Sequence, residues 1–197
     1  MSPAGTTPLR VGTRGSALAT TQTGHVARRL EELTGRDVEI VRIRTDGDVL
    51  TGSLAQMGGT GVFVTALREA LLDGRCDVAV HSLKDLPTEP APGLTVVTPE
   101  RENPRDVLCA RGGLTITTLR RGARVGTGSP RRAAQLRSVR PDLDVVDIRG
   151  NVDTRLARAL GEEADLDAVV LAYAGLARRG RLEAGEEVSD RALMAPA

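Results

Sequence analysis

Residues 77–87, DVAVHSLKDLP, carry the side chains best suited to chemistry in this chain. An apolar strand runs into a polar turn that holds His81, Ser82, Lys84 and Asp85, and a proline follows the turn. Open α/β sheets bind ligands at the carboxyl ends of their strands, where this turn is expected to lie. Lys84 is the only lysine among 27 basic residues. Among so many cations a carboxylate stays ionised, so Asp85 is predicted to accept protons or to stabilise a cationic intermediate.

A pair of arginines at a predicted helix start forms a second candidate site. In RVGTGSPRR, residues 124–132, a strand enters a glycine-rich turn, Ser129 is a suitable N-cap and a proline takes the first helical position. Arg131 and Arg132 then lie where unpaired backbone N–H groups, the helix dipole and two guanidinium groups favour a carboxylate or a phosphate. The alternative is two solvated arginines on a helix surface.

Three further motifs place polar or basic residues directly after strand-like runs: TRGS at 13–16, IRGNVDTR at 148–155 and AGLARRG at 174–180. Their candidate residues are Arg14, Ser16, Arg149, Arg155 and the pair Arg178 and Arg179, of which one is expected to be only a surface residue. The glycine-rich loop GGTGVF at 58–63 lacks the signatures of nucleotide-binding loops. Many arginines with a single Lys-Asp pair predict a ligand that carries several carboxylates.

The elements that position these residues alternate between strand and helix patterns. Strands are predicted at 9–13, 38–43 and 77–80, and helices at 16–33 and 62–71. Beyond a proline-rich stretch, strands are predicted at 107–110, 124–126, 143–148 and 168–172, with helices at 130–139 and 152–160. This order predicts an α/β fold of two lobes that resemble periplasmic binding proteins, with a ligand cleft between them. The second lobe is expected to repeat the architecture of the first.

The predicted boundaries follow from the proline-rich stretch. Lobe one is assigned to residues 1–101, a hinge to 102–105 and lobe two to 106–194, and residues 195–197 are expected to begin a second crossing segment.

Composition excludes several classes of protein. The net charge is +1, and one Tyr, one Phe and no Trp leave almost nothing on which bases can stack, so nucleic-acid binding is not expected. No apolar run is long enough to span a membrane, and the first ten residues do not resemble a signal peptide, so the protein is predicted to be cytoplasmic and free of membranes. Cys76 and Cys109 lie in no metal-binding spacing and are predicted to be buried thiols, so no metal is expected.

The motifs together resemble a known family. TRGS, GDV, GGTGVF, AVHSLKDLP, RENPRDVL, VGTGSPRR, IRGNVDTR and AGLARRG follow the order and spacing of the hydroxymethylbilane synthases, also called porphobilinogen deaminases. The resemblance covers nearly all of residues 9–180. It implies a transferase of tetrapyrrole biosynthesis, on the route to haem, chlorophyll and cobalamin. Such an enzyme condenses four porphobilinogen molecules head to tail, releases ammonia at each step and forms hydroxymethylbilane.

The resemblance also implies a role for each candidate residue. Asp85 matches the catalytic aspartate, which lies near the pyrrole nitrogens and stabilises the azafulvenium cation formed when ammonia leaves. His81 and Ser82 are expected to support it or to contact substrate, and a purely structural role for His81 is the alternative. The residues expected to bind the acetate and propionate groups of porphobilinogen and the oligopyrrole intermediates are Arg14, Ser16, Lys84, Ser129, Arg131, Arg132, Arg149, Arg155 and Arg178.

The sequence departs from the family pattern in two respects. Gln56 and Thr60 stand where many relatives carry lysines, which is expected to weaken or change some contacts. The family also holds a dipyrromethane cofactor, bound by a thioether to a cysteine of a third, C-terminal domain, and neither Cys76 nor Cys109 matches that context. We therefore expect that domain, and the segment that completes lobe one, to be absent from this sequence. The chain alone is expected to bind acidic pyrroles weakly without turnover, and the complete protein to be a monomer.

The competing hypothesis is a two-lobed module that binds or senses a small anion without chemistry, because fold does not fix function. A phosphoribosyl-transferring enzyme of similar shape is disfavoured, because the sequence shows no phosphate-binding loop.

Overall fold

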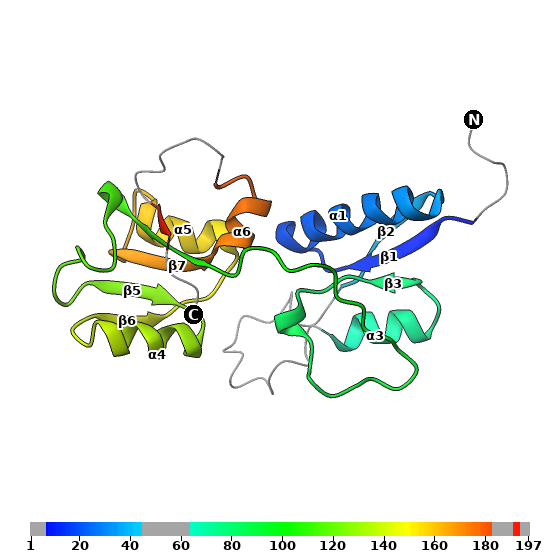
Figure 1. Cartoon of the computed structure of the whole chain (residues 1–197), viewed down its shortest axis with the longest axis horizontal. Helices are drawn as coiled ribbons and strands as arrows, with labels where there is room; N and C mark the ends of the chain where they lie inside the picture. Colours follow the sequence, from blue (N-terminus) through cyan, green and yellow to red (C-terminus); the bar gives the residue numbers. More distant parts are fainter. Residues whose placement is uncertain (1–6, 45–63, 183–190, 194–197) are drawn as a thin grey trace. The chain divides into compact units, whose positions relative to one another are not determined.

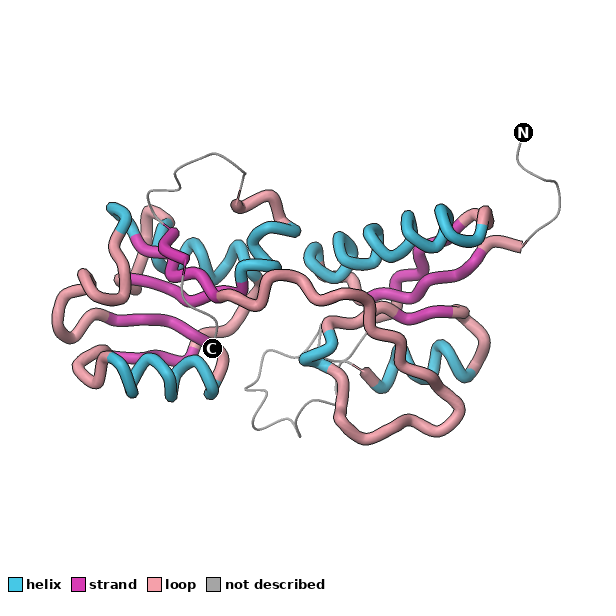
Figure 2. The backbone as a smooth tube through the Cα atoms, in the orientation of Figure 1, coloured by secondary structure: helices cyan, strands magenta, loops and turns pink. Residues whose placement is uncertain are grey.

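The computed structural model describes residues 7–44, 64–182 and 191–193. The chain divides into two compact units, Met1–Pro99 and Glu100–Ala197, here called unit 1 and unit 2. Each unit is an α/β structure (Figures 1 and 2).

Unit 1 is built on a three-stranded sheet in which every pairing is parallel, as predicted. Strands β1 (Leu9–Thr13), β2 (Val38–Arg42) and β3 (Val78–Ala79) lie in the order β2-β1-β3. The helices α1 (Ala17–Thr34) and α3 (Thr65–Leu72) lie on opposite sides of this sheet (Figure 1). A 3₁₀ turn, η1 (Leu83–Asp85), follows β3.

Helix α1 begins and ends at the residues that the sequence indicated. The Ser16 side chain accepts a hydrogen bond from the backbone N–H of Ala19 at 3.3 Å and so caps the first turn. Gly35 adopts the left-handed conformation, with φ of 65°, and its N–H donates to the carbonyl of Glu31. The helix therefore starts next to the carboxyl end of β1.

Unit 2 has a mixed five-stranded sheet in the order β6-β5-β7-β4-β8. Its strands are β4 (Asp106–Ala110), β5 (Arg124–Thr127), β6 (Asp144–Asp147), β7 (Ala168–Ala172) and β8 (Arg191–Leu193). Its helices are α4 (Pro130–Val139), α5 (Val152–Leu160) and α6 (Tyr173–Arg178), and a 3₁₀ turn, η2 (Arg111–Gly113), follows β4.

The expectation that the second lobe repeats the first was wrong in one respect. β5 pairs in parallel with β6 and β7, but β4 runs antiparallel to both β7 and β8. A parallel return needs a long crossover, usually a helix, and only η2 and turns lie between β4 and β5. The short strand β8 was also not predicted from the sequence.

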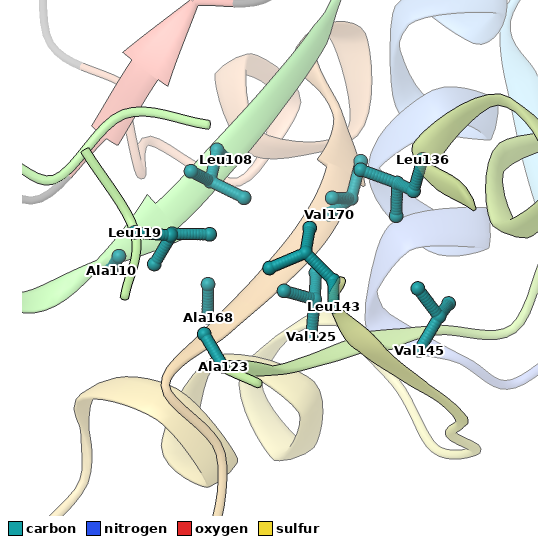
Figure 3. Packing of buried hydrophobic residues seen from close by; sticks show 10 residues of the cluster. All are labelled: Leu108, Ala110, Leu119, Ala123, Val125, Leu136, Leu143, Val145, Ala168 and Val170. Carbon is teal, nitrogen blue, oxygen red and sulfur yellow. The ribbon is translucent and has the colours of Figure 1, made fainter. Parts of the chain in front are cut away.

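The core of unit 2 has two layers of apolar side chains, one on each face of the sheet. On one face Leu136 of α4 packs with Leu108, Val125 and Val170 (Figure 3). On the other face Leu156 and Leu176, from α5 and α6, pack with alternate residues of β4 and β7. All five residues of β4 are buried, as expected for a strand covered on both faces. The helices that start at the carboxyl ends of β5 and β6 are thus fixed to the sheet by burial.

Candidate functional site

In unit 1 the candidate residues of the AVHSLKDLP motif form a turn that is anchored to two other elements. The N–H of Val80 donates to the carbonyl of Gly12 at 3.0 Å, which extends the β3 pairing beyond the strand. The 3₁₀ turn is closed by the N–H of Asp85, which donates to the carbonyl of Ser82 at 2.9 Å. The Ser82 hydroxyl and the Gln22 side-chain carbonyl of α1 form a hydrogen bond of 3.0 Å. The backbone that carries Asp85 is therefore fixed to both β1 and α1.

The charges around this turn show which side chains come together. Burial lowers the pKa of His81, the Asp85 carboxylate opposes this shift, and Arg14 and Arg68 add to it. His81 therefore lies within electrostatic range of one anion and two cations. Asp85 is half-buried and Lys84 is exposed, so the turn presents both side chains at the surface of the unit.

Arg14 and Ser16 follow β1 on the same edge of the sheet. Ser16 lines a hollow at the carboxyl ends of β1 and β2, together with Gly15, Arg42, Ile43 and Arg44. The Ser16 oxygen is used as the cap of α1, and its hydroxyl hydrogen is a further donor at that position. Unit 1 thus gathers Arg14, Ser16, His81 and the Lys84–Asp85 turn at one edge, as the sequence predicted for strands of a parallel sheet.

In unit 2 the start of α4 has the predicted form. The Ser129 side chain accepts from the N–H of Arg132 at 3.4 Å, and Pro130 takes the first helical position. Arg131 is exposed and donates from Nη1 to the Gln135 side chain at 2.9 Å. Arg132 instead turns to Asp106: its Nε and Nη2 donate to the two carboxylate oxygens at 2.8 and 2.6 Å. The alternative of two solvated arginines therefore does not describe Arg132, whose side chain is only 15% exposed.

Arg155 lies on α5 beside the same turn. Its Nε donates to the Gly150 carbonyl at 2.8 Å, and within the described part of the chain it forms no salt bridge with a carboxylate. A Cβ atom on Gly128 would lie 3.6 Å from both terminal nitrogens of Arg155, so this guanidinium lies against the β5–α4 turn. Burial lowers the pKa of Arg155, the cations Arg149 and Arg132 lower it further, and Asp147 opposes these effects. An anion bound here would offset this unfavourable clustering of positive charge.

The other two candidates of unit 2 are held by acidic partners. Arg149 forms a salt bridge of 3.1 Å with Asp147, and both side chains are well exposed. Arg178 lies 3.9 Å from a carboxylate oxygen of Glu102. Its neighbour Arg179 pairs with Asp153 at 3.1 Å, and this contact ties α6 to α5.

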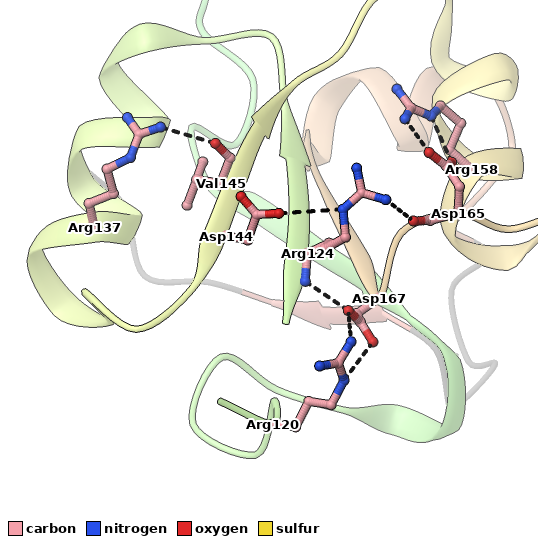
Figure 4. Close-up of polar contacts among 8 residues, drawn as sticks. All are labelled: Arg120, Arg124, Arg137, Asp144, Val145, Arg158, Asp165 and Asp167. Carbon is pink, nitrogen blue, oxygen red and sulfur yellow. Dashed lines mark hydrogen bonds and ion pairs between the residues drawn. The ribbon is translucent and has the colours of Figure 1, made fainter. Parts of the chain in front are cut away.

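The opposite ends of the strands show a contrasting charge pattern (Figure 4). The Arg120 guanidinium and the backbone N–H of Arg124 both donate to Asp167, and Nε of Arg124 lies 3.4 Å from a carboxylate oxygen of Asp144. Arg158 is paired with Asp165 through two hydrogen bonds. Arg120, Arg124 and Arg158, near the amino ends of β5, β6 and β7, are thus neutralised by aspartates. At the carboxyl ends Arg131 and Arg155 have only neutral hydrogen-bond partners among the described residues, which makes these two guanidinium groups better suited to an external anion.

Three contacts of the site were not predicted from the sequence. They involve Gln22, which contacts Ser82, Arg68, which lies near His81, and Asp106, which pairs with Arg132. Asp106 lies within the RENPRDVL motif and directly precedes a buried run, and a charged residue at such a position is a signal for a buried ion pair.

Some candidates lie elsewhere or outside the described residues. Cys76 and Cys109 are buried, as predicted, with 2% and 0% of their surface exposed. Gln56, Thr60 and the loop at 58–63 lie outside the described residues. Among the residues that are described, no helix has the length and apolar character needed to cross a membrane, and no cluster of three metal-ligating side chains occurs.

Comparisons with known proteins agree with these features. Residues 9–197 match the family model described as "Porphobilinogen deaminase, dipyromethane cofactor binding domain". The chain is similar to the porphobilinogen deaminase of Leifsonia xyli subsp. xyli, with 61% identity over 91% of this chain and 54% of the relative. It is also similar to that of Thermobifida fusca, with 55% identity over 98% of this chain and 60% of the relative. The chain therefore spans a little over half the length of these curated relatives.

Among solved structures, the chain is similar to a periplasmic substrate-binding protein of an ABC transporter from Coxiella burnetii. The identity is 16% and the TM-score 0.49, over 94% of this chain and 83% of that one.

Proposed function

The chain belongs to the porphobilinogen deaminase family, and from that premise we propose that it binds porphobilinogen and serves the hydroxymethylbilane synthase reaction. In this reaction the bond between the aminomethyl carbon and the nitrogen of porphobilinogen breaks, and ammonia leaves. The resulting azafulvenium cation is attacked by the free α-carbon of another pyrrole, which then loses its proton. After four such units have been joined, water adds to the azafulvenium carbon at the end of the tetrapyrrole, which supplies its hydroxyl group and releases the linear hydroxymethylbilane.

The observation that carries this proposal is the gathering of arginines at the carboxyl end of the unit 2 sheet. Porphobilinogen bears one acetate and one propionate, so each added unit brings two carboxylates. Arg131 and Arg155 offer guanidinium groups without a carboxylate partner in the described part of the chain. Arg132 and Arg149 add positive charge beside Arg155. Guanidinium groups bind carboxylates through two parallel hydrogen bonds, which favours a ligand of this class.

The proposed chemical residue is Asp85 of unit 1. It lies on a turn that is fixed by hydrogen bonds to β1 and α1, so the backbone that carries its carboxylate is in place before charge develops on the substrate. A fixed anion stabilises a cationic transition state more than a mobile one does, because no reorganisation is needed when the charge forms. Arg14, Ser16 and Lys84 at the same edge are proposed to bind carboxylates of the substrate, and Ser129 and Arg178 to do so in unit 2.

The residues of unit 2 also fit the dipyrromethane group that the family implies. That group carries acetate and propionate side chains, and the positive charge of the half-buried Arg155, near Arg132 and Arg149, favours such anions. We propose that Arg131, Arg132, Arg149 and Arg155 hold it. When bound, it supplies the primer to which porphobilinogen units are added.

The proposed partners are porphobilinogen and its oligopyrrole products. The same proposal includes a cytoplasmic, monomeric protein that contacts neither nucleic acid nor membrane. The near-neutral net charge of +1 supports the absence of contacts with nucleic acid and with anionic membranes.

Isothermal titration of porphobilinogen into the 197-residue chain tests the binding. The Arg155→Gln variant is expected to bind more weakly, whereas Arg121→Gln, an exposed arginine of the same unit, should bind normally. Equal binding by all three proteins would refute the assignment of Arg155.

Ammonia release, measured in the protein expressed from its whole gene, tests the chemistry. Asp85→Asn should abolish most of the release while the protein keeps its affinity for porphobilinogen. The control Glu89→Gln makes the same chemical change at an exposed position four residues away and should leave the rate unchanged. Unchanged release in Asp85→Asn would refute the assignment of Asp85, and an unaltered protein that binds porphobilinogen but releases no ammonia would favour an anion-binding module over an enzyme.

A further inference from the structure

Asp106 lies at the first position of β4 and is the only charged residue among the buried residues of the described chain. Its exposure is 8%, and a charged group at this depth is retained only when it is paired. Its partner is Arg132 of α4, 26 residues away in the sequence, and the exposed fractions of the two side chains are 11% and 15%.

The geometry of the pair shows which N–H bonds of the Arg132 guanidinium are not used by Asp106. Asp106 accepts from Nε at 2.8 Å and from Nη2 at 2.6 Å, which is the bidentate arrangement of a strong ion pair. A guanidinium has five N–H bonds, and this arrangement uses one on each of these two nitrogens. The two N–H bonds of Nη1 point away from Asp106, in the plane that the carboxylate fixes.

The charges near Arg132 show why its guanidinium needs to be held in a fixed orientation. Arg132 lies close enough to Arg155 to disfavour its charge, and Arg149 does the same. Without Asp106 the Arg132 side chain would be repelled by these two cations and would lose its fixed direction. The Asp106 carboxylate therefore holds the Arg132 guanidinium near Arg155 and Arg149, although the like charges repel one another.

We propose that Asp106 is a positioning residue that fixes the plane of Arg132 and so presents its Nη1 edge to a ligand carboxylate at the start of α4. The proposal rests on the proposed function in that the ligand is taken to be porphobilinogen. Asp106 itself repels the ligand's carboxylates and does not contact them. It acts through Arg132.

The test compares two aspartates that form the same kind of pair at the two ends of α4. Asp106→Asn removes the charge and one acceptor from the pair at the start of the helix. The control, Asp142→Asn, does the same to the bidentate pair with Arg140 that follows the end of the helix, where the exposed fractions are 23% and 19%. Isothermal titration with porphobilinogen should show binding that is weaker by roughly tenfold in Asp106→Asn, about the effect of losing one well-placed charge-assisted hydrogen bond, and unchanged in Asp142→Asn.

Arginine side-chain ¹⁵N NMR of the unaltered chain gives a readout that does not depend on a variant's folding. The Nε–H of Arg132 should exchange slowly with solvent, both without ligand and with saturating porphobilinogen, because Asp106 holds it in both states. Loss of this protection when porphobilinogen binds would overturn the proposal, since it would mean that the ligand replaces Asp106. Equal affinity of Asp106→Asn and the unaltered chain would overturn it as well.

The two proposals fail separately. If the unaltered chain binds no porphobilinogen, the proposed function is wrong, and a protected Arg132 Nε–H would still support the fixing of Arg132 by Asp106. If the unaltered chain binds porphobilinogen and Asp106→Asn binds equally well, the proposed function stands and the positioning role is wrong.

Discussion

Gly128, in the turn between β5 and α4, is expected to tolerate no larger residue. A Cβ atom at this position would lie 2.6 Å from the backbone carbonyl oxygen of Ile148, which follows β6. Real Cβ contacts shorter than 3.0 Å essentially never occur, so the carbonyl or the turn must move by at least about 0.4 Å. A backbone carbonyl next to a strand cannot swing aside as the end of a side chain can. We therefore expect Gly128→Ala to lower the free energy of unfolding by about 1–3 kcal/mol.

Gly126 provides the matched comparison two residues earlier, inside β5. A Cβ atom there would lie 2.7 Å from Cδ1 of Leu166 and 2.9 Å from Cγ2 of Ile148. The contact with Leu166 is with the end of a side chain, whereas Cγ2 of Ile148 branches from Cβ and moves less freely. Side chains can still shift further than a backbone carbonyl next to a strand, so Gly126→Ala should cost less than Gly128→Ala despite the greater depth of the residue. Only Gly128→Ala should also weaken anion binding, because relief of the 2.6 Å contact moves the turn against which the Arg155 guanidinium lies.

Urea denaturation followed by circular dichroism measures both free energies of unfolding, provided that the dependence on urea is unchanged between variants. A loss below about 0.5 kcal/mol for Gly128→Ala, the range of an ordinary surface change, would refute the argument from the backbone contact. A larger loss for Gly126→Ala than for Gly128→Ala would refute the distinction between side-chain and backbone neighbours.

Three further outcomes are expected. Arg140 lowers the pKa of Asp142 from 3.8 to about 2, so this carboxylate stabilises the fold above pH about 4, and its contribution is lost as the pH falls toward 2. The difference in unfolding free energy between the unaltered chain and Asp142→Asn should shrink over that range, and a constant difference would contradict the linkage. Burial lowers the pKa of His81 below 6.5, so an NMR titration of the folded protein should place the midpoint of this residue below that value. Because the unfolded chain takes up the proton at a higher pH than the folded one, the free energy of unfolding should fall as the pH drops below about 6.5. Gly24 lies inside α1, and the only atom near an added Cβ atom would be the end of the Arg28 side chain, at 3.9 Å. Gly24→Ala should therefore raise the free energy of unfolding by about 0.5–1 kcal/mol, because alanine favours the helix more than glycine does. A lower free energy of unfolding would contradict this reasoning.

Local signals in the sequence predicted most of the elements and their ends. Ser16 and Ser129 mark helix starts and Gly35 marks a helix end, because a cap depends on atoms only three or four residues away. The strands and helices follow from the spacing of apolar residues, which repeats within each element. The same signals placed the Lys84–Asp85 turn and the arginine motifs directly after strands.

The direction of β4 and the existence of β8 could not be predicted from the sequence and became known only from the tertiary structure. An apolar run predicts a buried strand, but it contains nothing that distinguishes parallel from antiparallel pairing. The short β8 pairs with β4 across more than 80 residues of sequence, as the register Val107↔Leu193 shows. Such a pairing depends on which edge of the sheet is available once the other strands have assembled.

The sequence by itself determined which residues could bind an anion, because the chemistry of an arginine at a helix start is a local property. Only the tertiary structure decided that Arg132 is held by Asp106, that Arg179 pairs with Asp153 and that Arg155 has no carboxylate partner among the described residues. Ion pairing depends on distance and on burial, and both are set when segments far apart in the sequence pack together. With 27 basic and 26 acidic residues in the chain, composition alone left these pairings open.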